Sequence, residues 1–410
     1  MLRVVHTSDW HLGQELAGWS RRAEHQAFFD QLEELLVERE ADALIVAGDV
    51  FDHQNPSAQA QAAFYEAMVR FRRARPSLTT VVIAGNHDAA GRVEAPRALL
   101  GVFGVHVVGS VRRRDGVLCP DTHAVPLRDR RGEIAAWASA LPFLRPVDLP
   151  PLRRDGEVSP IIEAVRDLYA EAAQAVSAHA GGDPLIMTGH LHVAGGLESE
   201  GAERRILVGG DHAVPPEVFP DAAAYVALGH LHRPQKVGRE TVRYSGAPFP
   251  MSATERNYRH GVTLVELNGD VRVEHVPFRR RAPFIRIPEE GAVPAQDAGD
   301  ALKAAVEKLG VPADAPPDER PFVQLVLRAD GPRSNLRHEL DRLGESLPVR
   351  IVSVRMERDA VVPDPKIGSA QRLADLDPET VFSEAFAREH GARPEPRHLA
   401  VFHDAVASEA

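Results

Sequence analysis

Side chains that can hold metal ions follow five short, mostly apolar runs in the first 232 residues. Each run has four to eight residues, is rich in Val, Ile and Leu, and is followed by a segment that contains Asp, Asn or His. The runs span residues 3–6, 41–47, 80–84, 184–187 and 223–228. The segments after them hold Asp9-Trp10-His11, Gly48-Asp49, Asn86-His87-Asp88, Gly189-His190 and His230-Leu231-His232. This repetition predicts one shared set of metal ligands.

Such a ligand set suits the hydrolysis of a phosphodiester. The displacement builds negative charge on the attacking and leaving oxygens, and two cations ~3.5–4 Å apart stabilise both at once. Asp49 is the candidate for a carboxylate that bridges the two ions. Asp, Asn and His ligands without a thiolate favour Mn²⁺, Fe²⁺ or Zn²⁺ over Mg²⁺ or Ca²⁺. The chain has one cysteine, Cys119, so a disulfide within the chain and a zinc site built from several cysteines are both excluded.

The runs have the length and composition of strands that are buried on both faces. The carboxyl ends of such strands lie on one edge of a sheet, where ligand sites gather, so we expect all five segments there. A spacing of two residues puts Asp9 and His11, and likewise His230 and His232, on one face of an extended segment. The glycines at 48, 85, 189 and 229 stand where the backbone must turn and approach closely.

Helices must connect these strands. Residues 21–39 have apolar positions at helical spacing, which predicts a strand-helix-strand unit. Its right-handed crossover puts Asp9 and Asp49 on the same edge. Further helices are expected at 57–73 and 94–101. His25, inside the first helix, is interpreted as a surface or packing residue.

Composition indicates an ordinary globular protein of two or three domains, with 410 residues, 44% hydrophobic and 26% charged. The N-terminus lacks the pattern of a signal peptide and no run approaches 18 apolar residues, so we expect a cytoplasmic protein without membrane spans. The net charge of −11 argues against holding nucleic acid by overall charge alone. Basic clusters lie at 70–75, 112–114, 128–131 and 279–281, and each is interpreted as a solvated face. That they bind DNA is a hypothesis.

The order Asp-x-His, Gly-Asp-x-x-Asp, Gly-Asn-His-Asp, Gly-His and Gly-His-x-His resembles the signature of calcineurin-like metallophosphoesterases. Within that superfamily, HTSDWHLGQ, GDVFD, GNHD and GHLHRPQ with RYSGAPFPMS resemble a family of DNA nucleases. Its bacterial members act with an SbcC-type coiled-coil ATPase, and it is similar to the archaeal and eukaryotic break-repair nucleases. The resemblance covers most of the chain and is strongest over residues 1–260.

The resemblance implies an α/β fold in which helices flank a metallophosphoesterase β-sandwich, followed by a small α+β cap domain and a helical C-terminal tail. It implies two divalent metal ions, with Mn²⁺ as the expected metal, and DNA as substrate. By position, the first ion would be held by Asp9, His11, Asp49 and His232. The second would be held by Asp49, Asn86, His190 and His230. His87 would assist the leaving oxygen, and Asp88 would orient His87.

Several further histidine and aspartate residues stay outside this assignment. Asp52 is interpreted as orienting its neighbours. His192 mimics the His-x-His spacing but is left as a non-ligand, as are His6, His53, His106 and His212.

The predicted domains are residues 1–280 for the nuclease, 281–362 for the cap and 363–410 for the tail. In the cap we expect a helix at 300–309, a strand at 322–328, a helix at 334–347 and a strand at 350–354. By resemblance the cap helps to admit and position DNA. Taken alone, it could equally be any small binding or dimerisation module.

The tail has two short apolar sets, Val381, Phe382 and Phe386, then Leu399, Val401, Phe402 and Val406. Such pieces either pack back on the cap or dock on a partner. By resemblance they bind the coiled coil of the SbcC-type ATPase, and the nuclease is a homodimer within a heterotetramer. Two rival functions stay open: another phosphatase or phosphodiesterase of the same fold, and a scaffold without catalysis.

Overall fold

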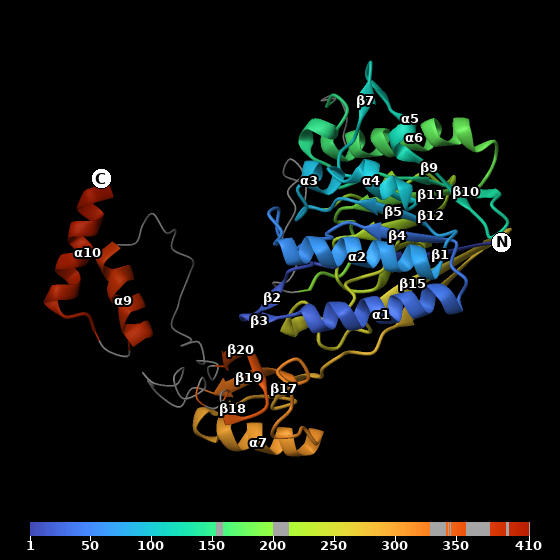
Figure 1. Cartoon of the computed structure of the whole chain (residues 1–410). Helices are drawn as coiled ribbons and strands as arrows, with labels where there is room; N and C mark the ends of the chain where they lie inside the picture. Colours follow the sequence, from blue (N-terminus) through green and yellow to red (C-terminus); the bar gives the residue numbers. More distant parts are fainter. Residues whose placement is uncertain are drawn as a thin grey trace. The chain divides into compact units, whose positions relative to one another are not determined.

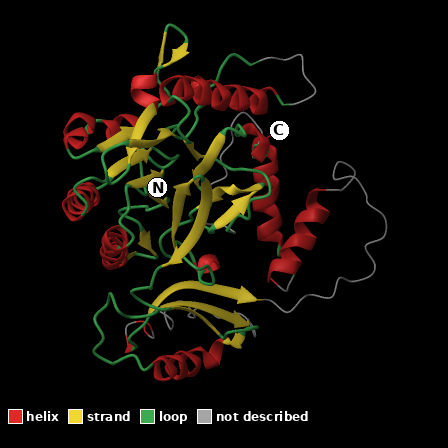
Figure 2. Ribbon diagram, turned by 90° about the vertical axis from the view of Figure 1, so that its right-hand side faces the viewer, coloured by secondary structure: helices red, strands yellow, loops and turns green. Residues whose placement is uncertain are grey.

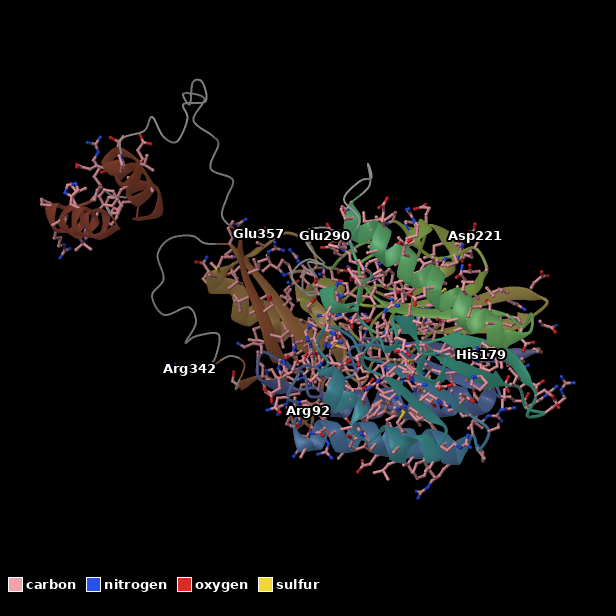
Figure 3. All side chains as sticks on the ribbon, turned by 90° about the horizontal axis from the view of Figure 1, so that it is seen from above. Arg92, His179, Asp221, Glu290, Arg342 and Glu357 are labelled. Atoms are coloured by element: carbon pink, nitrogen blue, oxygen red, sulfur yellow. The ribbon has the colours of Figure 1, made fainter. Side chains whose placement is uncertain are left out.

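The computed structural model describes residues 1–152, 159–199, 213–328, 342, 344, 346–357, 378–390 and 393–409. The chain forms two compact units, Met1–Glu357 and Arg358–Ala410. The first unit ends at Glu357, the last residue of strand β20 (Figure 3). Among the described helices, none combines the length and the apolar composition needed to cross a membrane.

The first sheet of unit 1 has six strands in the order β16-β15-β1-β4-β5-β6. Its parallel strands are β1 (Leu2–Thr7), β4 (Ala43–Ala47), β5 (Thr79–Ile83) and β6 (Val105–Val108). Strands β15 (Gly261–Asn268) and β16 (Asp270–Pro277) extend it in antiparallel fashion beside β1. The connecting helices are α1 (Arg22–Glu38), α2 (Ala58–Ala74), α3 (Ala90–Glu94) and α4 (Arg97–Val102). The helix expected at 94–101 is therefore α4, which begins three residues later, and a separate short helix, α3, precedes it.

The second sheet has the order β13-β14-β12-β11-β10-β9. Its strands are β9 (Ala124–Arg128), β10 (Ile134–Ser139), β11 (Leu185–His190), β12 (Ala223–Gly229), β13 (Gln235–Val237) and β14 (Arg239–Tyr244). Helix α6 (Pro160–Ala180) covers its outer face. Smaller elements are β2 (Glu15–Leu16), β3 (Trp19–Ser20), β7 (Arg113–Arg114), β8 (Val117–Leu118) and α5 (Pro120–His123).

The two sheets lie face to face between helical layers, with α1 and α2 on one side and α6 on the other (Figure 1). Strand β4 shows how the layers form, because successive side chains of a strand point to opposite faces. Leu44 and Val46 pack toward α1 and α2, while Ile45 and Ala47 pack into the core between the sheets. The β-sandwich implied by the resemblance is confirmed.

The expectation of one sheet edge for all five ligand segments was wrong. Strands β1, β4 and β5 belong to the first sheet, and β11 and β12 belong to the second. In this sandwich, the strands of both sheets are buried on both of their faces. Their composition alone therefore could not show whether they belong to one sheet or to two. The ligand segments nevertheless meet, because both sheets end at the same side of the sandwich.

A polar contact crosses the interior between the sheets. His6 on β1 is fully buried, and its Nε2–H donates to the carbonyl oxygen of Leu228 on β12 (3.2 Å). The hydroxyl of Tyr225, also on β12, lies 2.9 Å from Nδ1 of His6 and donates to it. Both ring nitrogens of the neutral His6 imidazole thus have a hydrogen-bond partner.

The cap is built on a four-stranded sheet, with α7 (Ala298–Leu309) packed on its core (Figure 2). Its strands are β17 (Phe284–Ile287), β18 (Val293–Pro294), β19 (Phe322–Arg328) and β20 (Arg350–Glu357). The expected strands and the first cap helix are therefore present. The helix expected at 334–347 falls largely outside the described residues.

One buried arginine joins the cap to the nuclease part. The guanidinium of Arg21 lies 4.8 Å from the ring centroids of both Phe249 and Phe322, and Phe322 belongs to β19. On the cap, the guanidinium of Arg350 lies 3.5 Å from the Phe322 ring. Arg21 also pairs with Glu24 and donates to the carbonyl oxygen of Pro250 (2.7 Å).

The described residues of unit 2 form α9 (Pro378–His390) and α10 (Pro396–Glu409), which pack on each other. The rings of Phe382 and Phe402 stack with centroids 4.5 Å apart, and Phe386 lies beside Phe382. His403 pairs with Glu379 at 2.8 Å. Phe382 and Phe386 of the first apolar set and Phe402 of the second thus form a small core, an arrangement that was not expected from the sequence. Val381 and Val401 stay exposed.

Candidate metal centre

The seven predicted ligands come together where the strands of both sheets end. The loops after β1 and β4 run side by side, because the amide of Asp9 donates to Gly48 and the amide of His11 donates to Asp49, both at 3.0 Å. His190 ends β11 opposite Gly229, the last residue of β12. The ligand segments are Asp9 to His11, Asp49, Asn86, His190, and His230 to His232.

The backbone at this centre is strained. Asp9, His11, Asp49 and His230 have φ values of 54°, 46°, 47° and 104°, a region that non-glycine residues rarely adopt. Seven non-glycine residues in the described part of the chain have a positive φ, and four of the seven are proposed ligands. Strain of this kind persists only where the surroundings fix it, and it is concentrated at functional sites. The folded chain therefore presents these side chains in set positions.

A first group of donor atoms belongs to Asp9, His11 and His232, whose ligand atoms lie within 4.8 Å of one another. All three residues are buried. Asp9 is fixed by the amide of His230, which donates to Oδ1 (2.9 Å), and by the hydroxyl of Ser8, which donates to Oδ2 (2.5 Å).

A second group consists of Asp9, Asp49 and His190, also within 4.8 Å of one another. The Nδ1–H of His190 donates to the carbonyl oxygen of Ala47 (2.8 Å), which turns Nε2 toward Asp49 and Asn86. Nε2 lies 3.3 Å from Oδ2 of Asp49 and 3.0 Å from Oδ1 of Asn86. His230 joins from the side, with its ring centroid 5.5 Å from that of His190. Asp9 is thus common to both groups, and Asp49 lies between His11 and His190.

The glycines before the ligands allow the segments that carry the ligands to pack closely. A Cβ atom on Gly85 would overlap the carboxylate of Asp49, and one on Gly48, which also has φ of 89°, would overlap the ring of His190. The close approach expected at these positions is confirmed.

The donor set fits a pair of divalent cations. Nε2 of His11 is buried and forms no hydrogen bond within the described part of the chain. A buried polar atom without a partner is costly, and a cation bound to His11 would satisfy this nitrogen. Burial opposes ionisation of Asp49, but the charges of His190 and His11 outweigh it and lower the pKa of Asp49. Asp49 is therefore an anion that can neutralise bound cations.

His87 lies beside the first donor group, with its ring centroid 4.8 Å from that of His11. Its Nδ1–H donates to the carbonyl oxygen of Asp52 (2.7 Å), so this carbonyl orients the ring, a role that we expected of Asp88. The amide of His87 donates to Oδ1 of Asp49 (2.8 Å). Nδ1 of His87 thus faces the backbone of Asp52, and Nε2 lies on the opposite side of the ring.

The carboxylate of Asp88 holds two loops together. It accepts hydrogen bonds from the backbone amides of Val50, Phe51 and Gly85, at 2.8–3.1 Å. Burial and the nearby Asp49 raise the pKa of Asp88 to about 6. Asp88 therefore fixes the loop of Asp49 against the loop of Asn86 and His87.

Asp52 has closer contacts than the sequence suggested. Its carboxylate lies 3.3 Å from Nδ1 of His11 and 3.0 Å from Nε2 of His53. With His11 and His87 it forms a third group of converging donor atoms. The expectation that Asp52 orients neighbours agrees with these contacts.

One functional candidate was missed in the sequence. Glu255 is fully buried, and it accepts a hydrogen bond from Nδ1–H of His232 (2.8 Å) and another from the amide of Met251 (2.8 Å). Burial opposes its ionisation, but His232 outweighs this effect and the pKa of Glu255 is lowered. A carboxylate behind a histidine fixes the ring and aims Nε2 at the metal position. The only sequence signal was a glutamate 23 residues after His232.

His192 stands apart from the donor groups found among the described residues. It pairs with Glu198 (3.5 Å), and its ring centroid lies 6.3 Å from that of His230. His25 is buried against Phe249. Of the two expected roles, surface residue or packing residue, it therefore has the second. His212 lies outside the described residues.

Comparisons with known proteins give matches for the nuclease part of the chain and for the region that follows it. Residues 2–234 match the family described as calcineurin-like phosphoesterase, and residues 281–390 match the type 5 capsule protein repressor C-terminal domain. The SbcD component of the SbcCD nuclease of Rhodobacter capsulatus is 49% identical over 388 residues, which cover 94% of each chain. The SbcD component from Escherichia coli K12 is 33% identical and covers 95% of this chain and 93% of that one. A dimetal phosphatase from Danio rerio covers 68% of this chain and 99% of its own, with 9% identity and a TM-score of 0.35.

Proposed function

Because the chain belongs to the calcineurin-like phosphoesterases and, among them, to the SbcD family of SbcCD nuclease components, we propose that it is a manganese-dependent DNA nuclease. It cuts duplex ends as an exonuclease and single strands and hairpins as an endonuclease. It works with an SbcC-type ATPase in the cytoplasm, in DNA end processing during recombination, repair and replication.

The observation that carries this proposal is the convergence of seven buried or half-buried Asp, Asn and His side chains at one end of the sandwich. We assign Asp9, His11, Asp49 and His232 to one ion. Asp49, Asn86, His190 and His230 are assigned to the other. When bound, such a pair of ions offsets the negative charge that develops during phosphodiester hydrolysis. Imidazole, carboxylate and amide ligands suit manganese.

The protein's own groups then complete the chemistry. His87, protonated at both ring nitrogens, keeps its Nδ1–H on the carbonyl oxygen of Asp52 and gives the Nε2 proton to the leaving oxygen. The ring is neutral afterwards and retains the Nδ1 hydrogen bond. Asp88 fixes the loop that carries His87. The strained backbone at Asp9 and Asp49 holds the ligands in place without further ordering on binding.

We also propose a homodimer that forms through α2 and the α3–α4 segment. Leu99 and Val102 on α4 support it, because they are 73% and 79% exposed. Large apolar side chains exposed side by side favour a protein interface. A double change of Leu99 and Val102 to Asp would then give a monomer in light scattering, whereas a dimer that survives the change would place the interface elsewhere.

Within the first compact unit we propose a boundary near residue 280 between the nuclease and the cap. The tail from residue 363 onward is then the segment that docks on the ATPase. The exposed Val381 and Val401 of unit 2 support docking, because its small core leaves them uncovered.

A nuclease assay tests the proposal directly. Blunt duplex, hairpin and single-stranded DNA are incubated with the protein and Mn²⁺, Mg²⁺ or Zn²⁺, with and without the ATPase. Cleavage with Mn²⁺ that disappears in Asp49→Ala is the expected result. Hydrolysis of a small aryl phosphodiester without any cleavage of DNA would favour a small-molecule phosphodiesterase, and metal binding without hydrolysis would favour a scaffold.

A further inference from the structure

A basic cleft lies at the same end of the sandwich as the candidate metal centre. It has a volume of about 840 Å³, and five arginines and the single cysteine of the chain line it: Arg97, Arg112, Arg113, Arg114, Arg145 and Cys119. The carboxylates of Asp121 and Asp148 also line it. From the sequence alone, residues 112–114 are expected to form a solvated face.

The cleft shares the edge of the sandwich at which the metal ligands lie. Strand β6 is parallel to β5, so Ser110 and the arginines that follow leave the sheet at the same side as Asn86. On the other wall, the amide of Phe143 donates to the carbonyl oxygen of Ala84 (2.8 Å) and its ring lies 6.5 Å from that of His190. Arg145 stands two residues further along. The segments that form the cleft therefore leave the sandwich at the edge where Asn86 and His190 lie.

Carboxylates hold three of the five arginines in place. Arg112 pairs with Glu94, Arg113 pairs with Glu171 (2.6 Å), and Arg145 pairs with Asp148 (2.9 Å). These ion pairs are partly buried, and they fix the three arginine side chains. A guanidinium has five N–H donors, so a fixed arginine can still bind a second anion.

The other two arginines have no such partner. Arg97 and Arg114 are exposed, and neither forms an ion pair or a side-chain hydrogen bond within the described ranges of the chain. Structural pairing thus accounts for three of the arginines but not for these two. Two guanidinium groups without such partners, on separate segments of one cleft, match successive phosphates better than a single small anion.

We propose that this cleft binds the phosphate backbone of DNA next to the phosphodiester at the metal centre. The assignment rests on the proposed nuclease function and adds the path that the DNA takes. Arg97 and Arg114 contact phosphates directly, and the paired Arg112, Arg113 and Arg145 add a fixed positive wall. Such contacts position DNA without reading its sequence.

Cys119 gives the full chain a natural reporter for this cleft. It is half-buried there, and its amide donates to the carbonyl oxygen of Arg112 (2.9 Å), so it is fixed beside the arginines. Because the chain has no other thiol, reaction with N-ethylmaleimide followed by mass spectrometry measures this position alone. The reaction is carried out in EDTA, which prevents cleavage, with and without a short blunt duplex.

Duplex DNA at about ten times its Kd should slow the labelling of Cys119 by about tenfold. The variant R97Q/R114Q should bind the duplex roughly threefold to thirtyfold more weakly. Its plot of log K against log salt should be shallower by about two, because each phosphate contact contributes a slope of about 0.9. The matched control R166Q/R272Q changes two exposed arginines away from the cleft and should keep both the affinity and the slope of the unaltered protein.

Two outcomes would overturn the assignment. One is DNA that binds and is cut while Cys119 reacts at an unchanged rate and R97Q/R114Q keeps the full slope. The other is equal protection of Cys119 by inorganic phosphate, which would make the cleft a site for free anions. A chain that neither binds nor cuts DNA would instead refute the proposed function, so the two failures are distinguishable.

Discussion

Three candidate ligands at the metal centre are each oriented by a neighbouring group. His190 is oriented by the carbonyl oxygen of Ala47, His232 by Glu255, and Asp9 by the amide of His230. Such neighbours determine which ring nitrogen or carboxylate oxygen faces the cation. The residues behind the ligands are therefore as testable as the ligands themselves.

Replacing Asp49 with Ala should abolish the binding of both ions and reduce DNA cleavage to background. The physical reason is the position of its carboxylate between His11 and His190, where it offsets the charge of two cations at short range. Metal content after dialysis, measured by plasma mass spectrometry, checks this. Retention of one full equivalent of manganese would show that Asp49 does not bridge the ions.

Replacing His87 with Ala should keep the metal content and lower turnover by about 10²–10⁴-fold, the usual contribution of a general acid. Single-turnover cleavage and metal analysis on the same sample separate the two effects. The exposed His106 provides a control, since His106→Ala should cleave normally. Loss of a metal ion from His87→Ala would instead make His87 a ligand.

Replacing Glu255 with Gln should weaken manganese binding by about 10–100-fold, because a carboxylate behind a ligating histidine fixes its ring and raises its basicity. Calorimetric titration with Mn²⁺ measures this change, and Glu274→Gln, at an exposed ion pair with Arg39, is the control. An unchanged affinity would limit Glu255 to a structural role.

At the scale of the elements, the contact between β1 and β12 makes the sandwich sensitive to acid. Burial lowers the pKa of His6 to about 3, although the carbonyl of Leu228 opposes this shift. His6 thus stays neutral in the folded protein, while in the unfolded chain it takes up a proton below about pH 6.5. The unfolded state then binds more protons, so acid favours unfolding.

As the pH falls from about 6.5 to about 4, protonation of His6 in the unfolded chain should therefore lower the free energy of unfolding by about 1.4 kcal/mol for each pH unit. Denaturant titrations at several pH values should show that His6→Gln loses this part of the slope. His179→Gln, which changes an exposed histidine on α6, should keep it. Parallel slopes for all three proteins would mean that His6 titrates normally in the fold.

Much of this arrangement could be predicted from the sequence, because apolar runs and the polar residues after them mark strand ends. Helix α1 was expected at 21–39 and lies at Arg22–Glu38. The division of strands between two sheets could not be predicted from periodicity, because β4 and β11 are buried on both faces alike. Glu255 was missed for another reason: its role depends on a contact between residues far apart in the chain, which no local pattern reveals.

At the scale of the whole molecule, the separate helical unit predicts what removal of the tail does. A chain that ends at Glu357 keeps both sheets and every candidate ligand, so it should still cut single-stranded DNA with Mn²⁺. It should lose co-purification with the ATPase and ATP-stimulated cleavage of duplex DNA. Double changes of Val381 and Val401 to Asp should have the same effect, since both valines are exposed. Full assembly of the shortened chain with the ATPase would show that another surface is the tether.

The division of the ligands between two sheets has a consequence for synthesis. Asp9, His11, Asp49 and Asn86 leave the ribosome early, whereas His190, His230 and His232 follow much later. Strand β1 gains its antiparallel neighbour only when Gly261–Asn268 has been made. A nascent chain thus carries an incomplete set of ligands for most of its translation, and it acquires the capacity to cut DNA only when both halves of the sandwich have closed on each other.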